Sequence, residues 1–104
     1  MTEMVNHPSH YNQEGRKECI VEMEELFGKF ETAKWALITA YKYLYRAGAK
    51  EGNSFEQDMD KVEWYIRYVV KEFNPGSVYE ANIITEMFNK VRGEFESMRK
   101  RCGL

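Results

Sequence analysis

The sequence predicts an all-α fold, a small bundle of about four helices preceded by an ordered, extended N-terminal arm. Three observations predict it. Apolar residues recur at helical spacing through most of the chain. Glycine, proline and serine mark the ends of the periodic stretches. No stretch alternates apolar and polar residues as a half-buried strand does. With 104 residues, the chain is expected to form one domain, residues 1–104, with a single modest core.

The arm is expected over residues 1–17 and a first helix over residues 18–27. Pro8 fixes its own backbone and keeps His7 out of the helical conformation. The arm is also too poor in aliphatic side chains to fill a core. The first helix ends at Gly28. Its apolar side chains are expected on one face, which consists of Cys19, Ile20, Met23, Leu26 and Phe27.

Two further helices complete a three-helix core over residues 18–73. The second is expected from about Thr32 to Ala47 and is ended by Gly48. Ser54 and Gln57 form a capping-box pattern that begins the third. The third helix has the most regular apolar periodicity in the chain. Its stripe consists of Phe55, Met59, Val62, Ile66, Val69 and Phe73.

A fourth helix is expected over residues 77–101, where Ser77 and Glu80 form a second capping-box pattern. Its apolar face consists of Ala81, Ile84, Phe88, Val91, Phe95 and Met98. This face either packs back on the second and third helices or pairs with its copy in another subunit. Four short helices leave much apolar surface to cover in so small a chain, so we expect a homo-oligomer held by the fourth helix.

Composition argues against several classes of protein. The formal charge of −2 is not that of a dedicated nucleic-acid-binding protein. No run approaches the roughly 20 apolar residues that span a membrane, and Met1 to Asn12 has no apolar signal-peptide centre. Cys19 and Cys102 lie far apart without metal-ligand spacing, so we expect two reduced thiols in a cytoplasmic protein.

Two clusters offer groups suited to a phosphorylated, ring-bearing ligand. Residues 6–11, Asn-His-Pro-Ser-His-Tyr, place both histidines of the protein beside a hydroxyl and a phenol. The alternative for this segment is a solvated polar tail. Residues 42–50, Lys-Tyr-Leu-Tyr-Arg-Ala-Gly-Ala-Lys, supply three cations. In this segment Arg46 lies at the end of a helix, where its guanidinium can bind phosphate through two hydrogen-bond donors. Lys50 adds a point charge.

The third helix adds Asp58, Lys61 and Tyr65, which share a face beside the apolar stripe. Two interpretations of this face are open. If it is an ordinary surface, Asp58 and Lys61 form an ion pair worth about 0.2–0.5 kcal/mol. If it belongs to a binding site, Tyr65 and its neighbour Trp64 stack a base.

Carboxylates on the first and third helices leave a metal-dependent alternative open. Glu22 and Glu25 lie on one face of the first helix, and further acids open the third. Carboxylates from two helices hold Mg²⁺ in all-α nucleotide pyrophosphohydrolases. However, the helix macrodipole by itself favours acids in the first turn of a helix.

The chain resembles a family of small phage proteins, the domain of unknown function 3310, over roughly residues 5 to 70. The resemblance rests on residues 5–11, 18–20, 42–48 with Lys50, Asp58 with Lys61, and 64–65. Members are often described as phage nucleotide kinases, because the family is similar to one that lacks a P-loop. The resemblance therefore implies a nucleotide ligand. By matched position, the site residues that it implies are His7, His10, Tyr11, Lys42, Arg46, Lys50, Asp58 and Lys61.

The chain departs from the family pattern at three positions, and the loss of a cation and an acid among them weighs more against catalysis than against binding. Thr39, Ala49 and Gln57 stand where the family usually has asparagine, lysine and an acid. We therefore expect a phage-encoded protein of the host cytoplasm that binds a nucleotide or nucleotide-derived signal and so sequesters a host defence messenger. The alternative is a nucleoside monophosphate kinase without a P-loop, and a weaker one is a pyrophosphohydrolase.

The sequence assigns neither catalytic residues nor a metal site. Mg²⁺ is implied only if the protein is an enzyme. The partners expected are the small molecule and further copies of the chain, with no membrane. The predicted ligand-binding residues are His7, Ser9, His10, Tyr11, Lys42, Arg46, Lys50, Asp58, Lys61 and Tyr65.

Deleting residues 1–11 should weaken nucleotide binding with little loss of stability, because the arm adds almost nothing to the apolar stripes. If protonated His7 and His10 contact phosphate, affinity should fall as pH rises from about 6 to about 8, across the imidazole pKa near 6.5. Calorimetry at several pH values measures both effects. Equally tight binding by the truncated chain would show that the segment is only a tail.

Overall fold

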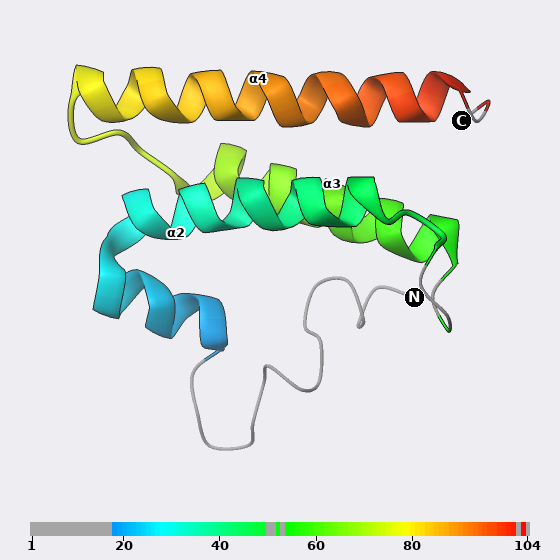
Figure 1. Ribbon diagram of the computed structural model, residues 1–104. Coiled ribbons are helices and arrows are strands. Elements are labelled where there is room, and N and C mark those ends of the chain that lie inside the picture. The colour runs from blue at the N-terminus through cyan, green and yellow to red at the C-terminus, as the bar shows by residue number, and fades with distance from the viewer. Residues whose placement is uncertain (1–17, 50–51, 53, 102, 104) are drawn as a thin grey trace.

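The computed structural model describes residues 18–49, 52, 54–101 and 103. These residues form three helices and no strand. The helices are α2 (Cys19–Tyr45), α3 (Phe55–Glu72) and α4 (Val78–Arg101). Helix α2 packs against both of the others, which contact each other much less (Figure 1). The predicted all-α class is confirmed for this part of the chain, whereas the ordered arm over residues 1–17 falls outside the described residues.

The first two predicted helices form one element that breaks at Gly28. This residue has φ 89° and ψ 158°, a conformation that glycine adopts readily because it has no Cβ. Helical backbone resumes at Lys29, earlier than the predicted start at Thr32. The Thr32 hydroxyl donates a hydrogen bond of 2.8 Å to the Gly28 carbonyl across the break. The predicted helix end at Gly28 is therefore correct, but the structure has a kink there rather than a separate connecting segment.

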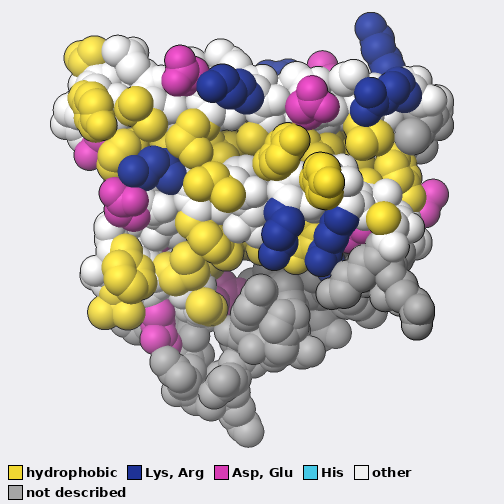
Figure 2. Space-filling model, in the orientation of Figure 1, with side chains coloured by type: hydrophobic (Ala, Val, Ile, Leu, Met, Phe, Trp, Pro, Cys, Tyr) yellow, Lys and Arg dark blue, Asp and Glu magenta, His cyan; other side chains and the backbone are white. Residues whose placement is uncertain are grey.

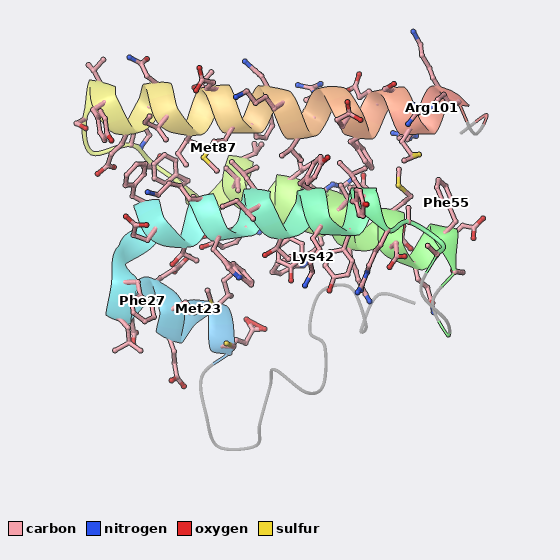
Figure 3. The ribbon with its side chains drawn as sticks, in the orientation of Figure 1. Met23, Phe27, Lys42, Phe55, Met87 and Arg101 are labelled. Atoms are coloured by element: carbon pink, nitrogen blue, oxygen red, sulfur yellow. The ribbon has the colours of Figure 1, made fainter. Side chains whose placement is uncertain are left out.

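The segment of α2 before Gly28 leaves much of its apolar face exposed. Leu26 and Phe27 are 73% and 65% exposed, and Ile20 and Met23 are half-buried. The break at Gly28 turns this segment away from the line of the rest of α2 (Figures 1 and 3). The helical period correctly placed these side chains on one face, but the kink decides how much of that face meets the core.

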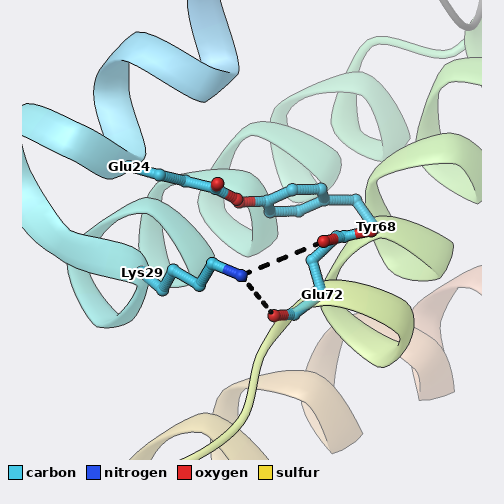
Figure 4. A network of polar contacts seen from close by, with 4 residues as sticks. All are labelled: Glu24, Lys29, Tyr68 and Glu72. Carbon is cyan, nitrogen blue, oxygen red and sulfur yellow. Dashed lines mark hydrogen bonds and ion pairs between the residues drawn. The ribbon is translucent and has the colours of Figure 1, made fainter.

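Polar contacts tie the two sides of this kink to α3 (Figure 4). The Tyr68 hydroxyl donates a hydrogen bond to the Glu24 carboxylate. On the other side of the break, Lys29 Nζ lies 4.0 Å from Glu72 Oε1 and donates to the Glu72 carbonyl at 3.5 Å. Burial of the phenol, with the nearby Glu24 carboxylate, raises the pKa of Tyr68 well above its usual range. Tyr68 therefore stays a hydrogen-bond donor throughout the neutral pH range.

The core lies along the helical part of α2 that follows Gly28. Ala33, Ala36, Leu37 and Ala40 there have no exposed surface. Small alanine side chains allow α3 and α4 to approach the backbone of α2 closely. The apolar residues that α3 and α4 bury are Met59, Val62, Tyr65, Val69, Ile84, Val91 and Phe95. The remaining members of both predicted stripes are half-buried. Those that pack around this core are Phe55, Ile66, Phe73, Phe88 and Met98.

Capping contacts begin α3 and α4, as predicted, but with one difference. The Gln57 N–H donates to Ser54 Oγ and the Ser54 N–H donates to Gln57 Oε1, both at 3.0 Å, so this capping box is complete. At α4, the Glu80 N–H donates to Ser77 Oγ at 3.1 Å. The Glu80 carboxylate, however, accepts from the Gly76 N–H at 2.9 Å, which makes only half of the predicted box.

The apolar stripe of α4 is used within the chain. Ile84, Val91 and Phe95 are buried, mainly against α2. Of the two alternatives for this face, the structure shows packing back on the preceding helices.

Among the described helices, none combines the length and apolar character needed to cross a membrane.

Replacing Tyr68 with phenylalanine should lower the free energy of unfolding by about 1 kcal/mol, because it removes the hydrogen bond to a carboxylate that keeps some access to water. The folded-state pKa of Tyr68 is raised. Its stabilising contribution is therefore complete below the unfolded pKa of about 10 and is lost as pH rises above it. Urea unfolding of both proteins between pH 7 and pH 11 measures the difference. A difference in unfolding free energy between the two proteins that stays constant from pH 7 to pH 11 would contradict this role of Tyr68.

Candidate functional site

Three cationic side chains from α2 and α3 converge on the ring of Tyr43. Arg46 Cζ lies 4.5 Å from the ring centroid, Lys61 Nζ 5.1 Å and Lys42 Nζ 5.9 Å. Lys42 and Arg46 lie about one turn apart at the end of α2. Figure 3 shows Lys42 on the side of α2 away from α4. Together with Asp58, these residues are called the Tyr43 cluster below.

The charges of this cluster are not balanced by the described residues. None of the side chains of Lys42, Arg46 and Lys61 forms an ion pair or a hydrogen bond to another described side chain. Each cation–π contact contributes about 0.5–1 kcal/mol at a partly exposed position. Like charges held close together repel one another, so the cluster favours an anion.

Tyr43 is held in place by other aromatic rings. It stacks on Tyr65 with a centroid distance of 6.1 Å and an interplanar angle of 13°. Trp35 and Trp64 meet the Tyr65 ring edge-on, at 5.5 and 5.1 Å. Tyr65 is only 6% exposed, so most of its ring is covered within the chain. Stacking of a base on Tyr65 stays a prediction. Tyr65 supports Tyr43, which is only partly buried.

Tyr43 is the site residue that the sequence prediction missed. Tyr43 belongs to the cationic segment of residues 42–50, but it is not one of the ligand-binding residues predicted from the sequence. A usable signal was present, because Tyr43 lies three residues before Arg46 and therefore shares a helix face with it. Its proximity to Lys61, which is on another helix, is a consequence of tertiary packing.

Asp58 is buried, which excludes the predicted alternative of a surface ion pair with Lys61. Its side chain has no exposed surface, and Oδ2 accepts a hydrogen bond of 3.0 Å from the Gly48 N–H. Asp58 also lies in the first turn of α3, where the helix dipole favours a carboxylate. This hydrogen bond links Gly48, just after the end of α2, to the start of α3.

Two members of the cluster contain buried polar atoms without a partner. Within the described part of the chain, only Arg46 Nε and Asp58 Oδ1 are buried side-chain nitrogen or oxygen atoms that lack a hydrogen bond. Each such atom costs about 1–3 kcal/mol when it is left unpaired, and native proteins contain few of them. One is a donor and the other an acceptor, so the pair suits a ligand that carries both kinds of group.

The structure brings together half of the predicted ligand-binding residues. Lys42, Arg46, Lys61 and Tyr65 lie around Tyr43, and Asp58 accepts a hydrogen bond from Gly48, two residues after Arg46. The other predicted residues lie outside the described ranges, namely His7, Ser9, His10, Tyr11 and Lys50.

The carboxylates considered for Mg²⁺ do not form a metal-binding group in the described ranges. No three His, Cys, Asp or Glu side chains there lie close enough together to hold a metal ion.

The family described as "Protein of unknown function (DUF3310)" matches residues 5–67 of the chain. This match covers more than half of the chain and includes α2 and most of α3, whereas α4 lies outside it. No curated protein matches the chain, and no solved structure does.

Replacing Gly48 with alanine should destabilise the protein more than the same change at Gly52. Both glycines have positive φ, 75° and 89°, so each alanine should cost about 1–2 kcal/mol in backbone strain. A Cβ at Gly48 would in addition lie 3.2 Å from Phe55 Cβ and 3.4 Å from its Cα, whereas a Cβ at Gly52 meets nothing within 4 Å. Chemical denaturation of the two variants measures the difference. Equal losses would show that the contact with Phe55 adds no constraint.

Proposed function

We propose that this chain, which belongs to the DUF3310 family, binds a nucleotide or a nucleotide-derived small molecule at the Tyr43 cluster. The observation that carries the proposal is the pair of buried, unpaired atoms, Arg46 Nε and Asp58 Oδ1. Arg46 caps the end of α2 and Asp58 lies in the first turn of α3. Arg46 is one of three cations that gather around Tyr43. A ligand with an anionic group and a hydrogen-bond donor would satisfy both atoms.

The cations are suited to phosphate. Arg46 carries a planar fork of donors that matches phosphate oxygens, and Lys42 and Lys61 add point charges from the two helices. Phosphate would also relieve the repulsion between these cations. This arrangement favours a phosphorylated ligand over an uncharged one.

The aromatic groups and Asp58 are suited to the remainder of a nucleotide. The stack of Tyr43 on Tyr65 is backed by two tryptophans, so the Tyr43 ring is held rigidly among the cations. The part of this ring that stays exposed offers an apolar edge to a base or a sugar. Asp58 Oδ1 accepts a hydrogen bond, for which a ribose hydroxyl or an exocyclic amine is the matching donor. Neither group identifies the base.

Binding without turnover is favoured over catalysis. Phosphoryl transfer between two nucleotides requires two adjoining nucleotide sites, whereas the described residues form one such cluster. We therefore propose that the protein sequesters its ligand, and for a phage-encoded protein a host defence messenger is the corresponding target. A nucleoside monophosphate kinase without a P-loop is the alternative function, with subunits sharing the sites, and a Mg²⁺-dependent pyrophosphohydrolase is a weaker one.

Replacing Arg46 with alanine should weaken nucleotide binding roughly ten- to a hundredfold, because one charge-assisted contact worth about 1.5–3 kcal/mol is lost. Calorimetry with a panel of mono-, di-, tri- and cyclic nucleotides measures the affinity, and circular dichroism checks the helix content. The matched control is Arg67→Ala, which removes an exposed arginine of α3 that pairs with Glu63. Equal affinities of the parent protein and Arg46→Ala would remove Arg46 from the site.

The same nucleotides, incubated with the protein and Mg²⁺ and then separated by chromatography, distinguish binding from turnover. We expect them to be recovered unchanged. Net conversion of a nucleoside monophosphate in the presence of a triphosphate would favour the kinase. Release of pyrophosphate would favour the pyrophosphohydrolase.

A further inference from the structure

A groove of about 580 Å³ lies between α2 and α4, on the opposite side of α2 from the Tyr43 cluster. Its floor is apolar and includes Leu37 and Val91, both buried. Ile38 and Tyr41, which also line it, remain 62% and 49% exposed. Figure 2 shows hydrophobic side chains gathered along α2 and its boundary with α4. A groove with such large exposed apolar side chains is typical of an interaction surface.

Two opposite charges on α4 line the groove without pairing with each other. Lys90 and Glu94 are exposed and four residues apart. Neither forms an ion pair with any described residue. Arg92 and Glu96 have the same spacing but lie away from the groove, and they pair at 3.1 Å. The rim of the groove therefore keeps one free cation and one free anion within the described part of the chain.

Gly93 lies in the same part of α4 as Lys90 and Glu94. It lies in the interior of a 24-residue helix, where glycine is less favourable than alanine. A Cβ at this position would meet nothing within 4 Å, so packing inside the described chain gives no reason for a glycine. Glycine on the exposed side of a helix lets another backbone approach closely. Gly93 lies between Lys90 and Glu94 and lines the same groove.

We propose that this groove binds a second copy of the chain, with the two α4 helices antiparallel about a two-fold axis. In such a pair Lys90 of each copy faces Glu94 of the other, so both rim charges find partners at once. The helices cross beside Gly93, and the exposed Ile38 and Tyr41 become covered. The occupant is a second copy because the charges of the groove are self-complementary, as a two-fold interface requires. This proposal is independent of the proposed ligand.

Charge reversal tests the pairing. Lys90→Glu and Glu94→Lys should each weaken the dimer at least tenfold, because each places like charges opposite one another twice. The double variant Lys90→Glu/Glu94→Lys restores opposite charges and should dimerise like the parent protein. The matched control is Arg92→Glu, which reverses an exposed charge on α4 away from the groove and should leave the dimer intact.

Sedimentation equilibrium of the full chain at micromolar concentration measures the association, and circular dichroism checks that each variant is folded. Gly93→Ala provides a second measurement. It should raise the melting temperature of the dilute, monomeric protein, because alanine favours helix, and yet weaken the dimer. A monomeric full chain would overturn the proposal. So would a dimer that the single charge reversals leave unchanged, or one that the double variant fails to restore.

Discussion

The close packing of α3 and α4 against one helix, α2, is the constraint on which the rest of the structure depends. Ala33, Ala36 and Ala40 of α2 have no exposed surface, so there is no room for a larger side chain without moving a neighbouring helix. Because α3 and α4 both pack against these alanines, the rest of the α2 surface is divided into two faces, here called flanks. One flank meets α3 and carries Lys42 and Arg46, and the other meets α4 and carries Ile38 and Tyr41.

Burial of Asp58 connects this packing to the proposed site. The carboxylate joins the end of α2 to the start of α3 through the Gly48 N–H, and it leaves its second oxygen without a partner. An ionised carboxylate in such a position is costly unless its hydrogen bonds are satisfied. A protein optimised for stability alone would satisfy or remove it, and natural proteins keep such exceptions mainly where function uses them. Arg46 is one of the three cations around Tyr43, and Asp58 binds the Gly48 N–H, two residues after Arg46, which fits this general pattern.

The two flanks of α2 keep the two proposed functions apart. The Tyr43 cluster is built from α2 and α3, within the part of the chain that matches the family. The groove on the other flank is built from α2 and from α4, which lies outside the match. Successive residues of α2 serve different sides, since Tyr41 lines the groove while Lys42 faces Tyr43. Association of two chains through the groove therefore leaves the ligand cluster uncovered.

Local chemistry by itself determined which segments are helical and where the chain breaks or caps them. The Ser54–Gln57 capping box, the break at Gly28 and the burial of Val62 within its stripe all follow from nearby residues and were predictable. Periodicity identifies the apolar face of a helix but not the helix that covers it. Only the tertiary structure therefore decided that Asp58 and Tyr65 are buried and that Leu26 is exposed. It also decided that the face of α4 packs back on α2 and that Lys61 reaches Tyr43, because both depend on how separate helices meet.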